Sequence, residues 1–261
     1  MCLIKTVFHV HTDYSDDANA SIEDVIDNAR RAGVGCVAVT DHDTIEGAER
    51  LAEAAGSALQ VIIGEEVSTT EGHVIGLFLH EPIEPGLSAR RAAELVHRQG
   101  GLVVAPHPFN RIFGCSLGDH VFRLRDLIDI VEVCNAQNLS PLPDRRAEDF
   151  ARRYRFPTLV GSDMHHRGYL DPCYQWLAPF DGPETFLAAI KRGHFVKSPH
   201  SPGYFVRCAH VILRERLQCG APEGYGRNCT RRRPRGRLVP VPVRTEPGLL
   251  TTGYRERGIE S

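Results

Sequence analysis

The 261-residue sequence lacks several features that define whole classes of protein. No apolar run approaches the roughly 20 residues that a membrane-spanning helix needs, so we expect no contact with a membrane. The opening segment, MCLIKTVFHVHTDYS, has neither a long apolar region nor a small-residue cleavage site, which argues against a secretory signal. None of the eight cysteines forms a C-x-x-C pair. Their scatter through predicted strands and loops is more typical of reduced thiols in the cytoplasm than of a disulfide framework.

The last part of the chain lacks any sustained helical or strand periodicity. Residues 214–261 contain eleven arginines and five glutamates but no lysine or aspartate, and prolines interrupt every strand pattern. We therefore divide the chain into a folded domain, residues 1–212, and a basic, Pro/Arg-rich tail, residues 213–261, which we expect to be disordered. The alternative interpretation is a basic arm that contacts a polyanion such as RNA.

What the sequence does contain is a series of short apolar runs that alternate with amphipathic segments. The runs are rich in Val, Ile and Leu, which is typical of strands buried on both faces of a parallel sheet. We expect strands at residues 6–10, 35–40, 59–64, 73–79, 101–105, 129–133 and 157–161. We expect helices at residues 21–33, 44–56, 88–101, 142–154 and 182–194. The alternation predicts an α/β fold, a seven-stranded (β/α) barrel, with an open doubly wound sheet as the competing architecture.

Imidazole and carboxylate side chains recur where these strands end. In chain order they are His9, His11, Asp16, His42, Glu65, Glu66, His107, Glu132, Asp163, His165 and His166, with Asn135 beside them and His73 opening the fourth strand. Because the strand ends of a parallel barrel converge on one face, we expect these side chains to meet there. Isolated charges would be costly to bury, so the set predicts bound metal ions.

Six short motifs occur in a fixed order: HVHTDYSD, TDHDT, GEEVS, GHVIGLF, APHP and GSDMHH. Together they resemble the motifs of the polymerase and histidinol phosphatase (PHP) superfamily of metal-dependent phosphoesterases, over roughly residues 5–195. The resemblance implies a distorted seven-stranded (β/α) barrel. It also implies a cofactor of two or three divalent ions, commonly Mn, Fe or Zn.

Carried over by motif, the resemblance implies nine metal ligands. The first ion would be held by His9, His11 and Asp163. Glu66 would bridge it to a second ion, which His73 and His107 would also hold. The third ion would be held by Asp16, His42 and His165. Glu65 is then a residue behind the ligands. Asp17 is a departure, because the family usually has glycine at that position.

The chemistry that the resemblance implies is hydrolysis of a phosphate monoester by a hydroxide that bridges the ions. The expected substrate is a nucleotide, a nucleoside bisphosphate or a short RNA 5′ end. Asp41, Asp43 and His166 are the candidates for a general acid. Arg111 and His166 are the candidates for binding substrate phosphate, because Arg111 follows a ligand histidine on the same loop.

Some alternatives stay open at this point. Phe109 and Phe113 either stack a nucleobase or cover the mouth of the barrel. A histidinol-phosphate phosphatase would use the same ions with a different pocket. A non-catalytic, metal-stabilised PHP module is the other alternative, and the complete ligand set argues against it.

Overall fold

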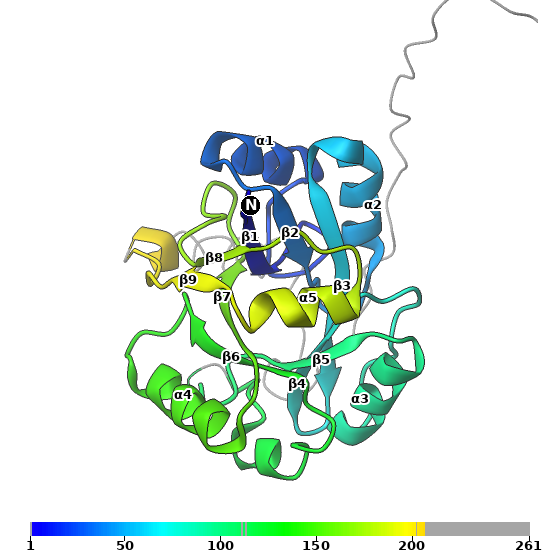
Figure 1. Cartoon of the computed structure of the whole chain (residues 1–261), viewed down its shortest axis with the longest axis vertical. Coiled ribbons are helices and arrows are strands. Elements are labelled where there is room, and N and C mark those ends of the chain that lie inside the picture. Colours follow the sequence, from blue (N-terminus) through cyan, green and yellow to red (C-terminus); the bar gives the residue numbers. More distant parts are fainter. Residues whose placement is uncertain (1, 111, 113, 202, 207–261) are drawn as a thin grey trace, which may run out of the picture. The chain divides into compact units, whose positions relative to one another are not determined.

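Seven strands of the computed structural model close into a barrel, as the sequence predicts (Figure 1). The structure describes residues 2–110, 112, 114–201 and 203–206. Around the barrel the strands are β2 (Cys36–Val39), β3 (Gln60–Thr69), β4 (Gly72–Leu77), β5 (Leu102–Ala105), β6 (Ile130–Asn135), β7 (Thr158–Met164) and β1 (Ile4–Val10). Because β1 pairs in parallel with both β2 and β7, the open doubly wound sheet is excluded. The predicted tail lies outside the described residues, so the division after residue 212 stays a prediction.

One barrel strand runs against the others. β4 pairs antiparallel with both β3 and β5, so the prediction of an all-parallel barrel is wrong at this strand. Only Thr70 and Glu71 separate β3 from β4. A connection of that length joins antiparallel strands, because a parallel crossover needs a dozen or more residues. The hairpin therefore places the start of β4 at the rim where β3 ends.

All five predicted helices are present. They are α1 (Ile22–Ala32), α2 (Glu46–Ala55), α3 (Ala89–Arg98), α4 (Leu142–Tyr154) and α5 (Pro183–Ile190). The first four flank the barrel on its outside (Figure 1). The short 3₁₀ helices η1 (Gly56–Ala58) and η2 (Gly118–Phe122) and the antiparallel strands β8 (Tyr174–Leu177) and β9 (His194–Val196) are additions to the prediction. No helix in the described part of the chain is long and apolar enough to cross a bilayer.

α5 lies across one end of the barrel (Figure 1). Its Phe186 is fully buried and meets Phe8, on β1, and Phe180 at ring-centroid distances of 5.6 and 5.0 Å. The same apolar cluster contains residues from the first halves of β2, β5 and β6. α5 therefore closes the end where the parallel strands begin. The polar ends of the strands are left for the opposite rim.

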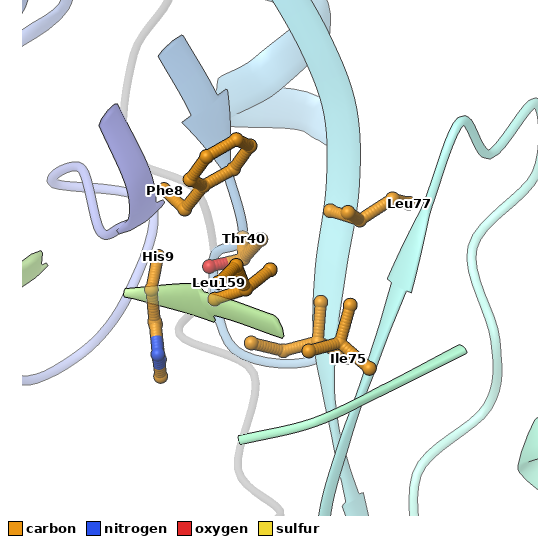
Figure 2. A pocket seen from close by; sticks show the side chains of 7 residues that line it. Phe8, His9, Thr40, Ile75, Leu77 and Leu159 are labelled. Carbon is orange, nitrogen blue, oxygen red and sulfur yellow. The ribbon is translucent and has the colours of Figure 1, made fainter. Parts of the chain in front are cut away.

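A small cavity separates this apolar plug from the polar rim. It is lined by Phe8, His9, Thr40, Ile75, Leu77, Val104 and Leu159 (Figure 2). His9 is the only ionisable group of the lining, and it marks the level at which the barrel interior changes from apolar to polar.

Phe186→Ala should test the plug. We expect the free energy of unfolding in urea to fall by about 3–5 kcal/mol, because a fully buried ring is removed from a packed cluster. Phe195→Ala is the matched control: its ring is 41% exposed on β9, and we expect a change within about 0.5 kcal/mol. Equal losses in the two variants would contradict the assignment of α5 as the structural closure of the barrel.

Candidate metal centre

The strand ends converge on one rim, as the sequence predicts. His9 and Asp163 lie near the ends of β1 and β7, and Glu66 lies towards the end of β3. His73 reaches the same rim from the start of β4, because that strand is antiparallel. The loops after β1, β2, β5 and β7 contribute His11, His42, His107 and His165.

Glu66 is the centre of this cluster. Its side chain is 1% exposed, and its two oxygens approach five imidazoles from four segments, since His9 and His11 are two residues apart. Oε1 lies 3.0 Å from both His73 Nδ1 and His107 Nε2, and Oε2 lies 3.2 Å from His9 Nε2 and 3.4 Å from both His11 Nε2 and His42 Nδ1. Of the two adjacent glutamates in the GEE motif, Glu66 therefore points into the cluster.

Glu65 points the other way, as alternation along a strand requires. Its Oε2 accepts a hydrogen bond of 2.8 Å from the Ile83 amide. Burial raises the pKa of this carboxyl to about 8. Glu65 thus lies outside the cluster, behind the strand that carries Glu66.

Two further carboxylates connect the remaining imidazoles. Asp163 Oδ1 lies 3.5 Å from the Nε2 atoms of His9 and His11 and 3.4 Å from His165 Nδ1. Asp17 Oδ2 lies 3.4 Å from His42 Nε2 and 3.3 Å from His165 Nε2. The cluster therefore contains six imidazoles and three carboxylates.

The third carboxylate corrects the sequence prediction. Asp16, the residue expected beside His42 and His165, is exposed, and Asp17 occupies that place instead. The two residues lie in the turn between β1 and α1, where no regular periodicity tells which side chain points inward. The only hint in the sequence that Asp17 could replace Asp16 as the ligand was the pair of adjacent aspartates in the SDD sequence.

The donor set fits divalent ions. Within the described part of the chain, four groups of three residues bring one ligand atom each within 4.8 Å of one another: His9, His11 and Glu66; His9, His107 and Asp163; His42, Glu66 and His73; and His11, His42 and His165. His11 Nε2, His42 Nδ1 and His73 Nδ1 are buried ring nitrogens that lie 3.0–3.4 Å from Glu66 oxygens without making a hydrogen bond. Buried imidazole nitrogens and carboxylates converging in this way are the ligands that Zn, Mn and Fe prefer. How the residues divide among separate ions stays a prediction.

The electrostatics of the cluster are self-complementary. Burial alone would raise the pKa of Glu66, but the imidazoles of His73 and His9 hold it well below its usual range. Burial opposes the charged form of His42 too, yet Asp17 and Glu66 raise its pKa to about 10. The Glu66 carboxylate is thus ionised, and the His42 imidazole attracts a proton that a metal ion would replace.

Asp41 is placed differently from what a general acid requires. Its Oδ1 accepts hydrogen bonds from the Thr12 amide (2.6 Å) and the Ser15 hydroxyl (2.7 Å), and Oδ2 accepts from the Thr12 hydroxyl (2.7 Å). Ser15 Oγ in turn contacts His11 Nδ1 at 3.2 Å and accepts from the His42 amide at 3.0 Å. This fully buried carboxylate therefore holds the turn that carries two ligands, and its placement does not favour a role in proton transfer.

Asp43 and His166 lie at the edge of the cluster. Asp43 is half-buried, and its Oδ1 accepts a hydrogen bond of 2.7 Å from the Ser68 amide. Burial raises the pKa of this carboxyl, against the effect of that hydrogen bond. His166 Nδ1 contacts the Arg167 carbonyl at 2.8 Å, and its ring meets Tyr169 edge-on. Both assignments as general acid stay predictions.

The predicted substrate contacts of the loop after β5 are only partly described. Phe109 is 4% exposed and packs against Phe122 and Phe150, so it covers the core and is not available to stack a base. Arg111 and Phe113 lie outside the described residues.

Fold and site together define a class: an α/β barrel with a rim of imidazoles and carboxylates, the architecture of PHP-like metal-dependent phosphoesterases. The chain belongs to the PHP family. Residues 8–142 match the PHP domain, and residues 141–195 match the PHP-associated region. A sequence relative is the uncharacterized protein MJ1587 of Methanocaldococcus jannaschii, 40% identical over 146 residues, which are 51% of this chain and 82% of that protein.

Solved structures share the fold. A two-domain protein from Bacteroides vulgatus, described as containing a predicted PHP-like metal-dependent phosphoesterase, has a TM-score of 0.62 at 17% identity, over 75% of this chain and 65% of that one. The lesion-specific endonuclease PfuEndoQ from Pyrococcus furiosus has a TM-score of 0.56 at 18% identity, over 73% of this chain and 56% of that one. This chain spans less than two thirds of either structure, and at these identities the likeness concerns the fold alone.

The two aspartates of the SDD sequence provide a matched pair of variants. Asp17→Asn should weaken the binding of one Mn²⁺ ion by at least about tenfold, because it removes a carboxylate that contacts two ligand imidazoles. Asp16→Asn changes the charge equally but alters an exposed side chain, so its titration should match that of the wild type. Calorimetric titration of the metal-free proteins measures both. The reverse ranking would return the ligand role to Asp16.

Proposed function

We propose that the chain is a metal-dependent phosphoric ester hydrolase that acts on a phosphate monoester. The observation that carries the proposal is the position of Glu66, one buried carboxylate within 3.0–3.4 Å of five imidazoles. A carboxylate in that position can bridge neighbouring ions. The proposed ligands are His9, His11, Asp17, His42, Glu66, His73, His107, Asp163 and His165.

The position of each group of residues determines the role that we propose for it. Divalent ions held at this rim would supply the positive charge that lowers the pKa of water and neutralises phosphate oxygens. Glu66 and Asp163 would offset part of that charge, and the imidazoles fix the ligand atoms because they are anchored at the ends of β1, β2, β5 and β7 and at the start of β4. The apolar plug at the other end of the barrel keeps water out of the interior beneath the site.

Departure of the alcohol requires a proton, for which Asp43 is our preferred donor. It follows His42 directly, and burial raises the pKa of its carboxyl, which favours the protonated form that an acid needs. His166 is the competing donor, and it is also our candidate, with Arg111, for binding substrate phosphate.

For the substrate we propose a nucleotide, a nucleoside bisphosphate or a short RNA 5′ end. Support comes from the resemblance of the motifs to compact PHP phosphatases and from the shared fold with an endonuclease. Histidinol phosphate is the competing substrate, since it would need the same ions.

Removal of metal is the first test. Protein treated with EDTA should lose phosphate release, and adding back Mn²⁺, Zn²⁺ or Fe²⁺ should restore it. A substrate panel of nucleotides, bisphosphates, 5′-phosphorylated short RNA and histidinol phosphate then ranks kcat/KM. Glu66→Gln should abolish turnover, whereas Glu65→Gln, the adjacent buried glutamate on the opposite face of β3, should retain it. Metal binding without hydrolysis of any ester would favour the non-catalytic module.

The identity of the general acid can be tested by comparing phosphate esters whose leaving groups differ in their need for a proton. Asp43→Asn should lower kcat for an alkyl phosphate by about 10²–10⁴, and far less for an aryl phosphate whose leaving group needs no proton. Asparagine tolerates the left-handed backbone of Asp43 (φ 55°) and can still accept from the Ser68 amide, so the fold should be kept. If His166→Ala shows this dependence on the leaving group and Asp43→Asn does not, the roles are reversed.

A further inference from the structure

Three of the proposed ligands have a backbone conformation that residues other than glycine rarely adopt. His9, His107 and Asp163 have φ angles of 60°, 27° and 49°, in the left-handed region. The same three residues form one of the groups that bring ligand atoms within 4.8 Å. Each such conformation costs on the order of 1–3 kcal/mol and persists only where the surroundings fix it. The question is therefore what fixes these three.

Glu132, on β6, contacts two of them. Its carboxyl is 1% exposed. Oε1 lies 2.9 Å from His9 Nδ1, and Oε2 accepts a hydrogen bond of 2.5 Å from the His107 amide. A carboxylate can only accept, so His9 must carry its proton on Nδ1 and keep Nε2 directed at Glu66 and Asp163.

Asn135, at the end of the same strand, contacts the third. Its Nδ2 donates to Asp163 Oδ2 at 2.9 Å and to Glu132 Oε2 at 3.0 Å. Its Oδ1 accepts from the Gln137 amide at 2.9 Å. That last hydrogen bond fixes the orientation of the side-chain amide, because a flipped amide would set two donors against each other.

Gly161, on β7, leaves the space that Glu132 occupies. A Cβ at this position would overlap Glu132 Oε1 and come within 3.2 Å of His9 Cβ. Gly161 pairs in register with Asn135, so the missing side chain lies directly beside the two polar residues of β6.

We infer that Glu132 and Asn135 form a positioning pair that holds His9, His107 and Asp163 in the geometry required for metal binding, in a space that Gly161 keeps open. The inference rests on the proposed metal centre and assigns roles to residues that are not ligands themselves. A hydrogen bond to the far nitrogen of a ligand histidine fixes its tautomer and makes it a stronger ligand.

Asp129, just before β6, is a half-buried carboxylate in a structural position, and it provides a control for the positioning role of Glu132. Its Oδ2 lies 2.8 Å from His97 Nε2 and accepts a hydrogen bond of 2.8 Å from the Val103 amide. Glu132 likewise contacts one imidazole and one backbone amide, in addition to the Asn135 side chain, whereas His97 is not one of the proposed metal ligands. Asp129→Asn is therefore a matched control for Glu132→Gln.

The test measures Zn²⁺ affinity of the full-length metal-free protein by competition with a chromophoric chelator. In Glu132→Gln, one of the two acceptors becomes an NH₂ that faces either His9 or the His107 amide. We expect the affinity to fall by about 10–100-fold. Asp129→Asn should lower the urea midpoint without changing the affinity. Gly161→Ala removes no polar group but displaces Glu132, so it should lower the affinity as Glu132→Gln does.

Three outcomes are decisive. Wild-type protein that binds no metal would overturn the proposed function itself. Wild-type binding with unchanged affinity in Glu132→Gln and Gly161→Ala would overturn the positioning pair alone. If neither variant folds, ¹⁵N NMR of the Zn²⁺-loaded wild type decides: a protonated, slowly exchanging His9 Nδ1 with Nε2 bound to zinc supports the pair, and zinc on Nδ1 overturns it.

Discussion

The burial of Glu66 among five imidazoles is the constraint on which the rest of this structure depends. A carboxylate that is 1% exposed is tolerated only where positive charge surrounds it. Here that charge is delivered by side chains from four segments, so the barrel must close for the cluster to exist. The cluster in turn contains imidazole nitrogens that lie close to carboxylate oxygens without making a hydrogen bond, so bound cations account for it better than hydrogen bonds alone.

The fold supports this rim in two ways. The reversed strand β4 brings His73 to the same side as Glu66, which a parallel strand would not do. α5 closes the opposite end with Phe186, which packs against Phe8 and Phe180, so the interior is apolar up to the level of His9. Between the two, carboxylates and amides that are not ligands, Asp41 and Glu132 among them, bind the turns and backbones that carry the imidazoles.

Much of this architecture could be predicted from the sequence, and the exceptions have physical reasons. Apolar runs and amphipathic segments gave the seven barrel strands and five helices, because burial dictates both patterns. The direction of β4 was also readable, since the eight residues between the predicted strands 59–64 and 73–79 are too few for a parallel crossover. The place of Asp17 in the cluster could not be predicted, because a turn has no period that tells inward from outward side chains. Nor could the left-handed conformations of His9, His107 and Asp163, which depend on hydrogen bonds from a strand more than a hundred residues from the first of them.

The central claim is that the buried carboxylate and its imidazoles hold divalent cations. Anomalous diffraction from crystals grown with Mn²⁺ tests it most directly, because it locates ions without assuming any activity. The account predicts strong peaks at this rim, beside Glu66 and the neighbouring imidazole nitrogens. An anomalous map with no peak at this rim, from protein that is folded and saturated with Mn²⁺, would contradict it.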